Sequence, residues 1–222
     1  MNNSIVLVSG GMDSCVVAAI AASKNETLSF LHVNYGQLTE KKELDCFNSI
    51  AKYYNAKNKL IVDISHLKNI GGSCLTDENI NVPDANLDSN DIPISYVPFR
   101  NANILAIATS WAEVINVNSI YIGAVEEDSS GYPDCRRGFY DAFEKCIKEG
   151  TKPETKIKIK TPLINLSKKE IVIKGKDLSA PLHMTWSCYK SNNKPCKKCD
   201  SCHLRKRGFR EAGFRDPIEK LY

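Results

Sequence analysis

The sequence has no hydrophobic run that approaches the roughly 20 apolar residues needed to span a bilayer. It also lacks a basic segment followed by a long apolar run near residue 1, so no secretory signal is indicated. Its 222 residues are 42% hydrophobic and 25% charged, which is not the bias of a disordered chain. We therefore expect a soluble, cytoplasmic protein with no membrane partner and one sizeable core.

Histidine is scarce, with four in the chain. His32 lies in a predicted strand, and His66 and His183 are isolated in the sequence. His203 directly follows a clustered cysteine and is interpreted as a bystander. A catalytic dyad needs a base within hydrogen-bond reach of a nucleophile. The histidines therefore do not indicate nucleophilic catalysis, and the chemistry must come from other residues.

Cysteine, by contrast, occurs nine times. In a cytoplasmic protein, cysteines are better explained as metal ligands and small buried residues than as disulfides. Four of them, Cys188, Cys196, Cys199 and Cys202, form a cluster that contains a CxxCxxC run. Four thiolates close a tetrahedral site, so we predict one structural zinc ion per chain. Iron–sulfur proteins use similar spacing, and such a cluster is the alternative.

The most informative motif is Ser-Gly-Gly-Met-Asp-Ser at residues 9–14, between the apolar run 5–8 and the small-residue run 15–20. This order predicts a strand, a glycine turn and a helix. Two glycines let the backbone approach a ligand closely, and N–H groups at a helix N-terminus attract anions. We therefore predict a phosphate site formed by Ser9, Gly10, Gly11, Met12, Asp13 and Ser14.

This loop lacks the lysine that ends a Walker loop and carries Asp13 and Ser14 instead. A carboxylate beside phosphate oxygens is repulsive unless a divalent cation bridges them. Asp13 therefore indicates a nucleotide bound with magnesium.

The chain alternates predicted strands and helices. Strands are predicted at 5–8, 28–33, 60–64, 119–124 and 157–160. Helices are predicted to begin near 15 and 39, to cover 101–115 and 139–148, and to follow a capping box at 167–170. Repeated βα units predict an α/β fold with a doubly wound parallel sheet and ligands at the carboxyl ends of its strands. We expect a nucleotide-binding core at 1–180 and a zinc-binding segment at 181–222 packed on it.

Two segments interrupt the alternation. Residues 65–97 lack the periodicity of a stable element, so they are either a lid or binding loop or a plain surface insertion. Residues 125–137 follow a strand directly and mix charges with glycines, which favours a binding site at the strand end.

The string at 9–14 resembles the PP-loop ATP pyrophosphatases, which cleave ATP between its α and β phosphates to adenylate a substrate oxygen. Further motifs narrow the resemblance to the 7-cyano-7-deazaguanine synthase family, in the same order from about residue 5 to about residue 217. These motifs are Asn34-Tyr35-Gly36-Gln37, Val97-Pro98-Phe99-Arg100-Asn101, Ser130-Gly131-Tyr132-Pro133-Asp134-Cys135-Arg136, Thr161-Pro162-Leu163 and the cysteine cluster.

The resemblance implies an ATP-dependent carbon–nitrogen ligase that converts 7-carboxy-7-deazaguanine and ammonia to 7-cyano-7-deazaguanine, through an adenylate and an amide, in the biosynthesis of queuosine or a related 7-deazapurine. It implies a Rossmann-like fold of the adenine nucleotide alpha hydrolase type, magnesium with the ATP, and a homodimer.

The resemblance also assigns roles to residues. The loop 9–14 holds pyrophosphate, with Asp13, Ser14 and the cation Arg100 as the catalytic groups. Lys169 reaches the ATP, although it is equally explained as a lysine on a helix face. The deazaguanine is bound by Asn101, Gly131, Tyr132, Asp134 and Arg136.

The C-terminal residues 188–222 carry ten Lys or Arg against four Asp or Glu. This charge either forms a surface for an anionic partner such as RNA or balances the thiolates of a metal site. We expect no direct nucleic-acid binding. Two other functions stay open, a PP-loop enzyme that thiolates tRNA and a non-catalytic nucleotide- or nucleic-acid-binding module.

Overall fold

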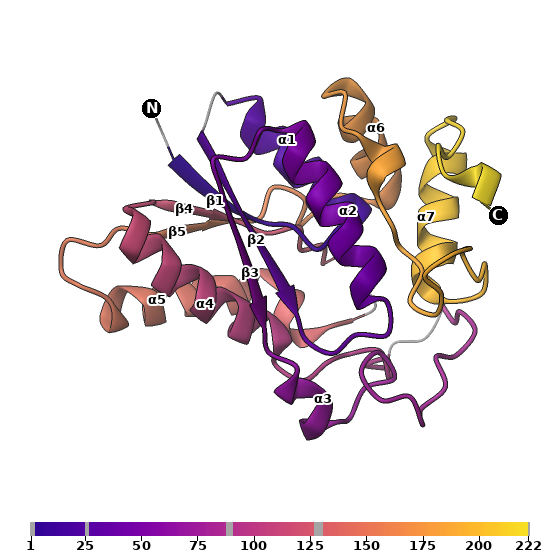
Figure 1. Cartoon of the computed structure of the whole chain (residues 1–222), viewed down its shortest axis with the longest axis horizontal. Helices are drawn as coiled ribbons and strands as arrows, with labels where there is room; N and C mark the ends of the chain where they lie inside the picture. The colour runs from indigo at the N-terminus through magenta and orange to yellow at the C-terminus, as the bar shows by residue number, and fades with distance from the viewer. Residues whose placement is uncertain (1–2, 25–26, 88–90, 127–130, 222) are drawn as a thin grey trace.

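The computed structural model describes residues 3–24, 27–87, 91–126 and 131–221, and its centre is a sheet of five parallel strands (Figure 1). In spatial order the strands are β3 (Asn58–Asp63), β2 (Thr27–Asn34), β1 (Asn3–Leu7), β4 (Ser119–Tyr121) and β5 (Lys158–Lys160). The predicted doubly wound parallel sheet is confirmed.

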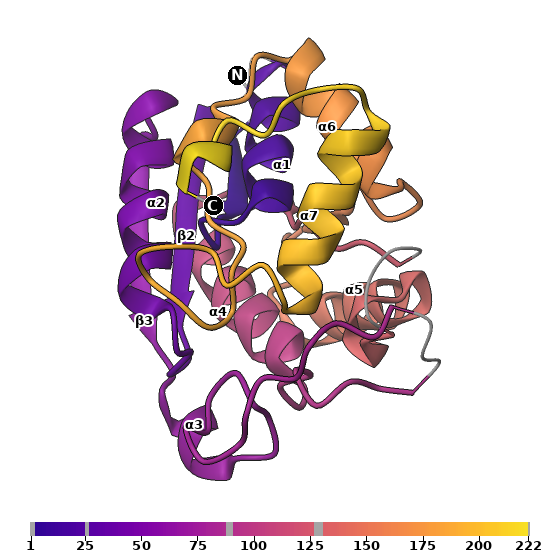
Figure 2. The same ribbon diagram turned by 90° about the vertical axis from the view of Figure 1, so that its right-hand side faces the viewer.

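Helices cover both faces of this sheet (Figure 1). One layer contains α1 (Met12–Ala22) and α2 (Glu40–Tyr53), and the opposite layer contains α4 (Arg100–Ile115) and α5 (Arg137–Gly150). Two more helices, α6 (Lys168–Asp177) and α7 (Asp200–Glu211), pack against each other beside α1 (Figure 2).

The strand sequences explain the two layers, because neighbouring residues of a strand point to opposite faces. In β1, Ile5 and Leu7 are buried with α4 and α5, whereas Val6 is buried with α1, α2 and α6. Both faces of β1 are therefore apolar, as in a central strand of a parallel sheet.

Local signals place several helix ends. The predicted capping box is confirmed, since the Ser167 side chain accepts from the N–H of Glu170 and the Glu170 carboxylate accepts from the N–H of Ser167. This reciprocal pair satisfies two N–H groups that the first turn of α6 leaves without helical partners.

Some element predictions need correction. The strand predicted at 119–124 ends at Tyr121, and residues 122–124 continue as irregular chain. The segment 65–97 was expected to contain no regular element, but it begins with a short helix, α3 (His66–Ile70), which ends at Gly71 with φ +80°. Short 3-10 helices lie at Pro133–Cys135, Leu182–Met184 and Glu219–Leu221.

The chain after α6 returns across the carboxyl end of the sheet. It passes through the cysteine-rich segment and then forms α7 (Figure 2). Arg205 of α7 is 1% exposed and pairs with Asp216, at 2.7 Å between Nε and Oδ2. Within the described residues, no helix is both long enough and apolar enough to cross a membrane.

Candidate active site

A cleft of about 280 Å³ opens at the carboxyl ends of β1, β2 and β4. The chain adds strands outward on both sides of β1, so this is the point where the strand order reverses, and such points are the usual ligand sites of open α/β sheets. Its walls come from distant parts of the chain: the loop after β1, residues of β2 and α2, the start of α4, the segments after β4 and near Tyr132, Lys168, and the C-terminal segment with α7.

The loop between β1 and α1 forms one wall. The N–H of Gly11 donates to the Ser9 hydroxyl at 3.2 Å, and the Ser14 hydroxyl donates to the carbonyl of Gly11 at 3.0 Å. Met12 and Ser14 are buried in the first turn of α1, and both line the cleft. The predicted strand, glycine turn and helix are present, with the helix N-terminus facing the cleft.

Position 10 must be glycine because neighbouring backbone leaves no room for a side chain. Its φ is +90°, and a Cβ at this position would lie 2.4 Å from the carbonyl oxygen of Glu43 in α2. Its own carbonyl accepts from the N–H of Trp186 at 3.0 Å. The loop is therefore held between α2 and the C-terminal segment, and any side chain at Gly10 would displace it.

Asp13 forms an ion pair with Lys168, at 2.6 Å between Oδ2 and Nζ. Its other oxygen, Oδ1, is buried and has no hydrogen-bond partner among the described residues. A buried carboxylate oxygen without a donor is well suited to a divalent cation, because hard cations bind oxygen ligands. Asp13 therefore fits the predicted role next to magnesium.

Lys168 is the lysine of the cleft, whereas Lys169 is exposed and does not line it. The prediction from sequence named Lys169 and missed Lys168. Helix α7 positions Lys168, since a Cβ on Gly208 would lie 2.9 Å from the Lys168 Cβ. Side chains of neighbouring helix residues point about 100° apart. The rotation of α6 about its axis therefore decides which of the two lysines faces the cleft.

Arg100 begins α4 and faces the loop across the cleft. It donates from Nη1 to the Tyr35 hydroxyl at 3.3 Å, and its guanidinium lies 5.2 Å from the centre of the Tyr35 ring. Burial lowers the pKa of Arg100, but the combined effect of its neighbours Tyr35, Tyr132, Cys135 and Asp134 raises it above its ordinary value, so the side chain stays a cation. The structure brings the predicted cation Arg100 into the same cleft as Asp13.

The residues predicted to bind the deazaguanine divide into three groups. Asn101 and Tyr132 line the cleft, whereas Gly131 and Arg136 are exposed and do not. Asp134 is buried behind the wall, where its Oδ2 accepts from the N–H of Asn101 at 2.9 Å. Burial raises the pKa of the Asp134 carboxyl, against the lowering effect of the Asn101 N–H and the Arg100 charge.

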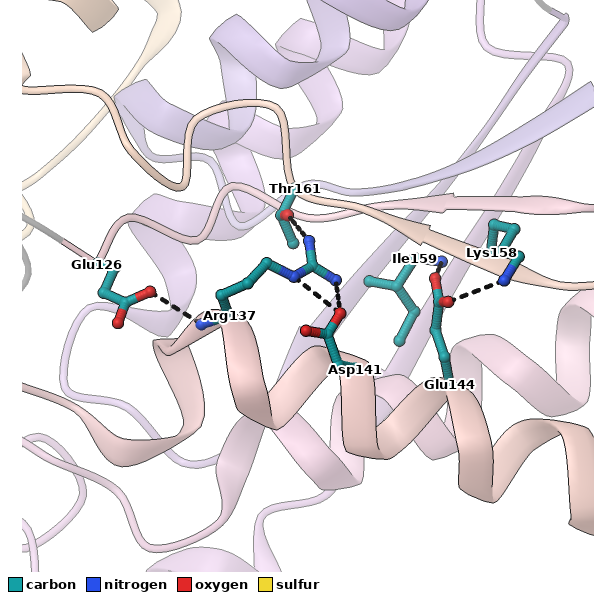
Figure 3. A network of polar contacts seen from close by, with 7 residues as sticks. All are labelled: Glu126, Arg137, Asp141, Glu144, Lys158, Ile159 and Thr161. Atoms are coloured by element: carbon teal, nitrogen blue, oxygen red, sulfur yellow. Dashed lines mark hydrogen bonds and ion pairs between the residues drawn. The ribbon is translucent and has the colours of Figure 1, made fainter.

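A network of polar contacts anchors the segment after β4 (Figure 3). Glu126 accepts from the N–H of Arg137 at 2.9 Å, while the Arg137 side chain donates to Thr161 at 2.7 Å and pairs with Asp141 at 2.8 Å. Both ends of the predicted substrate segment are thus attached to α5 and to the end of β5. Residues 127–130 of this predicted segment lie outside the described residues.

The four clustered cysteines come together beside the cleft. The Sγ atoms of Cys188, Cys196, Cys199 and Cys202 all lie within 4.8 Å of one another. A tetrahedral zinc site, with Zn–S bonds of about 2.3 Å, requires sulfurs roughly 3.8 Å apart, so the cluster fits one ion. Hydrogen bonds from the Cys199 and Cys202 thiols hold the pKa of Cys188 below its usual range.

The cysteine cluster also shapes the cleft. Ser187 and Tyr189 flank Cys188, Ser201 precedes Cys202, and all three line the cleft. An ion held by the cysteines would therefore fix this wall.

Besides Lys168, two further charged residues of the cleft wall were not selected from the sequence. Arg205 is buried and pairs with Asp216, and Glu43 lies in α2 behind Gly10. Their spacing in the sequence carries no recognisable motif. Only the packing of α2 and α7 against the phosphate loop brings them to the site.

Comparison with known proteins gives a consistent result. The model of a family described as "Queuosine biosynthesis protein QueC" matches residues 3–213. The chain is 57% identical over 216 residues to the 7-cyano-7-deazaguanine synthase of Chlorobaculum tepidum, covering 97% of this chain and 95% of that protein. The 7-cyano-7-deazaguanine synthase of Chloroherpeton thalassium is also 57% identical over 216 residues, covering 97% and 96%.

Among solved structures, one similar fold is that of a 4-thiouridine synthetase in complex with RNA and with bound ATP. The TM-score is 0.51 with 15% sequence identity, covering 96% of this chain and 50% of that one. At this level of identity the similarity concerns the fold alone.

Proposed function

Because the chain belongs to the QueC family of queuosine biosynthesis proteins, we propose that it converts 7-carboxy-7-deazaguanine and ammonia to 7-cyano-7-deazaguanine at the expense of ATP. This membership confirms the resemblance inferred from the motifs. The observation that carries the proposal is the 57% identity, along 97% of the chain, to a protein named for this product.

The reaction requires activation because a carboxylate is a poor electrophile, from which oxide would have to leave. Attack of the carboxylate oxygen on the α-phosphorus of ATP releases pyrophosphate and forms a mixed anhydride. Ammonia then displaces AMP to form the amide. A second ATP activates the amide oxygen in the same way, and loss of AMP leaves the nitrile. No protein nucleophile is needed, so the protein acts by positioning and electrostatics.

The phosphate loop would hold the departing pyrophosphate. Its support is the glycine turn between Ser9 and Ser14 at the N-terminus of α1, which faces the cleft. Asp13 would hold magnesium through its unpartnered Oδ1, and the ion would neutralise phosphate charge. Lys168 both orients Asp13 and adds a cation at this end of the cleft.

The opposite wall would bind the acid and stabilise charge. Arg100 supplies a fixed cation beside Tyr35, and the side chains of Asn101 and Tyr132 offer polar contacts to a purine-like ring. Asp134 would act through Asn101, because its contacts are with that residue and it does not line the cleft. Gly131 and Arg136 would contact the substrate only after a change in their segment.

The four cysteines would hold one structural zinc ion in each chain. Metal analysis of the purified protein should find one zinc per chain, and iron with sulfide would instead indicate the alternative cluster. We further propose a homodimeric protein of the cytoplasm that takes ammonia directly, with residues 181–222 forming a zinc-binding unit packed on a core at 1–180.

The test mixes the protein with magnesium ATP, ammonium and 7-carboxy-7-deazaguanine, and follows nucleotides and the new nitrile by mass. The expected products are AMP, pyrophosphate and 7-cyano-7-deazaguanine, with two AMP formed per nitrile. Release of ADP and orthophosphate alone, without AMP, would overturn the proposed chemistry.

A further inference from the structure

Glu43 is a carboxylate in the cleft that the pyrophosphate chemistry does not use. It lies in the first turn of α2, is half-buried and lines the cleft together with Tyr35 and Arg100. Among the described residues that line the cleft, the only other carboxylate is Asp13, which pairs with Lys168. Glu43 therefore differs from Asp13 in having no lysine or arginine in contact with its oxygens among the described residues.

Hydrogen bonds hold the Glu43 side chain in one orientation. The Thr39 hydroxyl donates to Oε1 at 2.6 Å, and the Gln37 amide donates from Nε2 to Oε2 at 3.2 Å. The backbone N–H of Tyr35 donates to Oε1 of Gln37 at 2.8 Å, which fixes the way the Gln37 amide points. Each carboxylate oxygen of Glu43 accepts one bond from these neighbours and keeps a further lone pair for a ligand.

The surroundings adjust the proton affinity of Glu43. Burial raises the pKa of the Glu43 carboxyl to about 7, against the lowering effect of the Thr39 and Gln37 hydrogen bonds and of the Arg100 charge. Glu40 on the same helix raises this pKa further. The other charged or titratable groups on the cleft walls are Tyr35, the Asp13–Lys168 pair, Tyr132, Cys135, Tyr189 and Arg205.

The proposed reaction releases protons from nitrogen at three points. Ammonium must lose a proton before it can attack, and the attacking ammonia loses another as the C–N bond forms and the bond from carbon to the AMP oxygen breaks. The activated amide must then lose its N–H protons as the nitrile forms and the second AMP leaves. Each step needs an acceptor near the reacting carbon, and an acceptor with a pKa near the working pH is the most efficient.

The other candidates in the cleft are poorer acceptors. Asp13 already pairs with Lys168, and it lies in the loop proposed to hold pyrophosphate. Burial raises the pKa of the Cys135 thiol to about 11, so this group stays protonated at neutral pH. Tyr35 and Tyr189 also have raised pKa values, through burial and through neighbouring phenols respectively, and would serve as donors.

We propose that the carboxylate of Glu43 accepts the proton from the nitrogen, first as ammonia attacks the adenylate and then as the activated amide becomes the nitrile. This inference rests on the proposed function. In the first step the ammonia lone pair forms the C–N bond, the C–O bond breaks toward AMP, and one N–H proton passes to a Glu43 oxygen, which releases it to water before the second step. The amide loses one N–H proton to water as its oxygen is adenylated. The nitrogen lone pair of the resulting imidate then forms the third C–N bond, the C–O bond breaks toward AMP, and the last N–H proton passes to Glu43.

The test compares Glu43→Gln with the matched control Glu40→Gln, which removes a carboxylate from the same helix outside the cleft. Adenylation alone is measured by exchange of pyrophosphate into ATP, with the acid present and ammonium absent. Amide formation is measured in a single turnover with ammonium across pH.

With Glu43→Gln we expect exchange within about 3-fold of wild type and amide formation lower by about 100-fold, a typical contribution of a general base. Wild-type amide formation should rise with pH through about 7, since Glu43 must be ionised to accept a proton, and the variant should lack this inflection.

Three results would overturn the inference. An equal loss of exchange and amide formation in Glu43→Gln would indicate a structural role. A normal rate with the inflection retained would exclude proton transfer by Glu43. If wild type itself shows neither exchange nor nitrile, the proposed function fails, and the inference fails with it.

Discussion

The two walls of the cleft are built in different ways. The phosphate wall comes from one continuous stretch, residues 9–14, whose geometry is set by its own glycines and by the start of α1. The facing wall is assembled from α2, α4, the segment after β4 and the C-terminal segment. The first wall is a local motif, whereas the second exists only when distant segments pack correctly. Substitutions should therefore affect chemistry on the first wall and stability on the second.

The largest expected effect lies on the phosphate wall. Asp13→Ala should lower AMP and nitrile formation by at least about 1,000-fold, because it removes charge stabilisation at the site of the leaving pyrophosphate. The melting temperature should fall less than in a variant that breaks a fully buried pair, because the Asp13 side chain is 28% exposed and water can hydrate the Lys168 ammonium that loses its partner. Turnover near the wild-type rate would remove Asp13 from the mechanism.

On the assembled wall, Arg205→Met should act mainly on stability. The substitution leaves the Asp216 carboxylate buried without its cation, which costs about 3 kcal/mol in the free energy of unfolding. Denaturant unfolding measures this loss. The matched control is Arg210→Met in the same helix, because the Arg210 side chain is 72% exposed and its surface pair with Glu211 contributes little. Equal stability of the two variants would contradict the distinction between the walls.

A smaller effect separates two adjacent lysines. Lys168→Ala should lower turnover by about 100-fold, through loss of a buried cation beside the phosphates and of the group that orients Asp13. Lys169→Ala should stay within about 2-fold, since its side chain is exposed and lies outside the cleft. If a steady-state assay showed a larger loss of turnover in Lys169→Ala than in Lys168→Ala, the prediction from sequence, Lys169, would be favoured.

The smallest effect concerns Glu43 and depends on pH. Its folded-state pKa of about 7 lies above its ordinary value of 4.5, so the folded protein keeps this proton more strongly than the unfolded chain. The stability that this proton contributes is present below pH 4.5 and is lost as the pH rises through 7.

Glu43→Gln cannot lose that proton. The pKa difference between 4.5 and about 7 corresponds to at most about 3 kcal/mol, and the partial exposure of Glu43 reduces this to ~1 kcal/mol. The melting temperature of the variant should therefore rise relative to wild type between pH 4.5 and 8, by about 2–4 °C in a chain of this size. A difference that does not vary with pH would contradict the raised pKa.

Local patterns predicted much of the fold. The apolar run before the glycines predicted β1, and Ser167 with Glu170 predicted the start of α6, because both signals act between residues close in sequence. Element lengths were harder to predict. β4 ends at Tyr121 rather than continuing to 124, because a strand ends where its neighbours end, and β5 pairs only as far as that residue.

The site, like the fold, was predicted well where its residues are close in sequence and poorly where they are distant. The phosphate loop and the four cysteines come together as their spacing indicated. The predicted boundary between a core at 1–180 and a segment at 181–222 stays a prediction, as do the roles of individual residues. Gly131 and Arg136 share a motif with Tyr132 but point elsewhere, because sequence proximity does not determine which side chains face a cavity.

The sequence by itself determined the alternating strands and helices, the glycine turn before α1 and the set of four clustered cysteines, since each depends on backbone preference or residue type over short spacings. Three placements depend on the tertiary structure. Lys168 rather than Lys169 pairs with Asp13, Glu43 lies next to Gly10, and Asp134 lies behind Asn101. The physical reason is that burial and charge depend on distances between segments far apart in the chain. Those distances exist only once both faces of the sheet are covered.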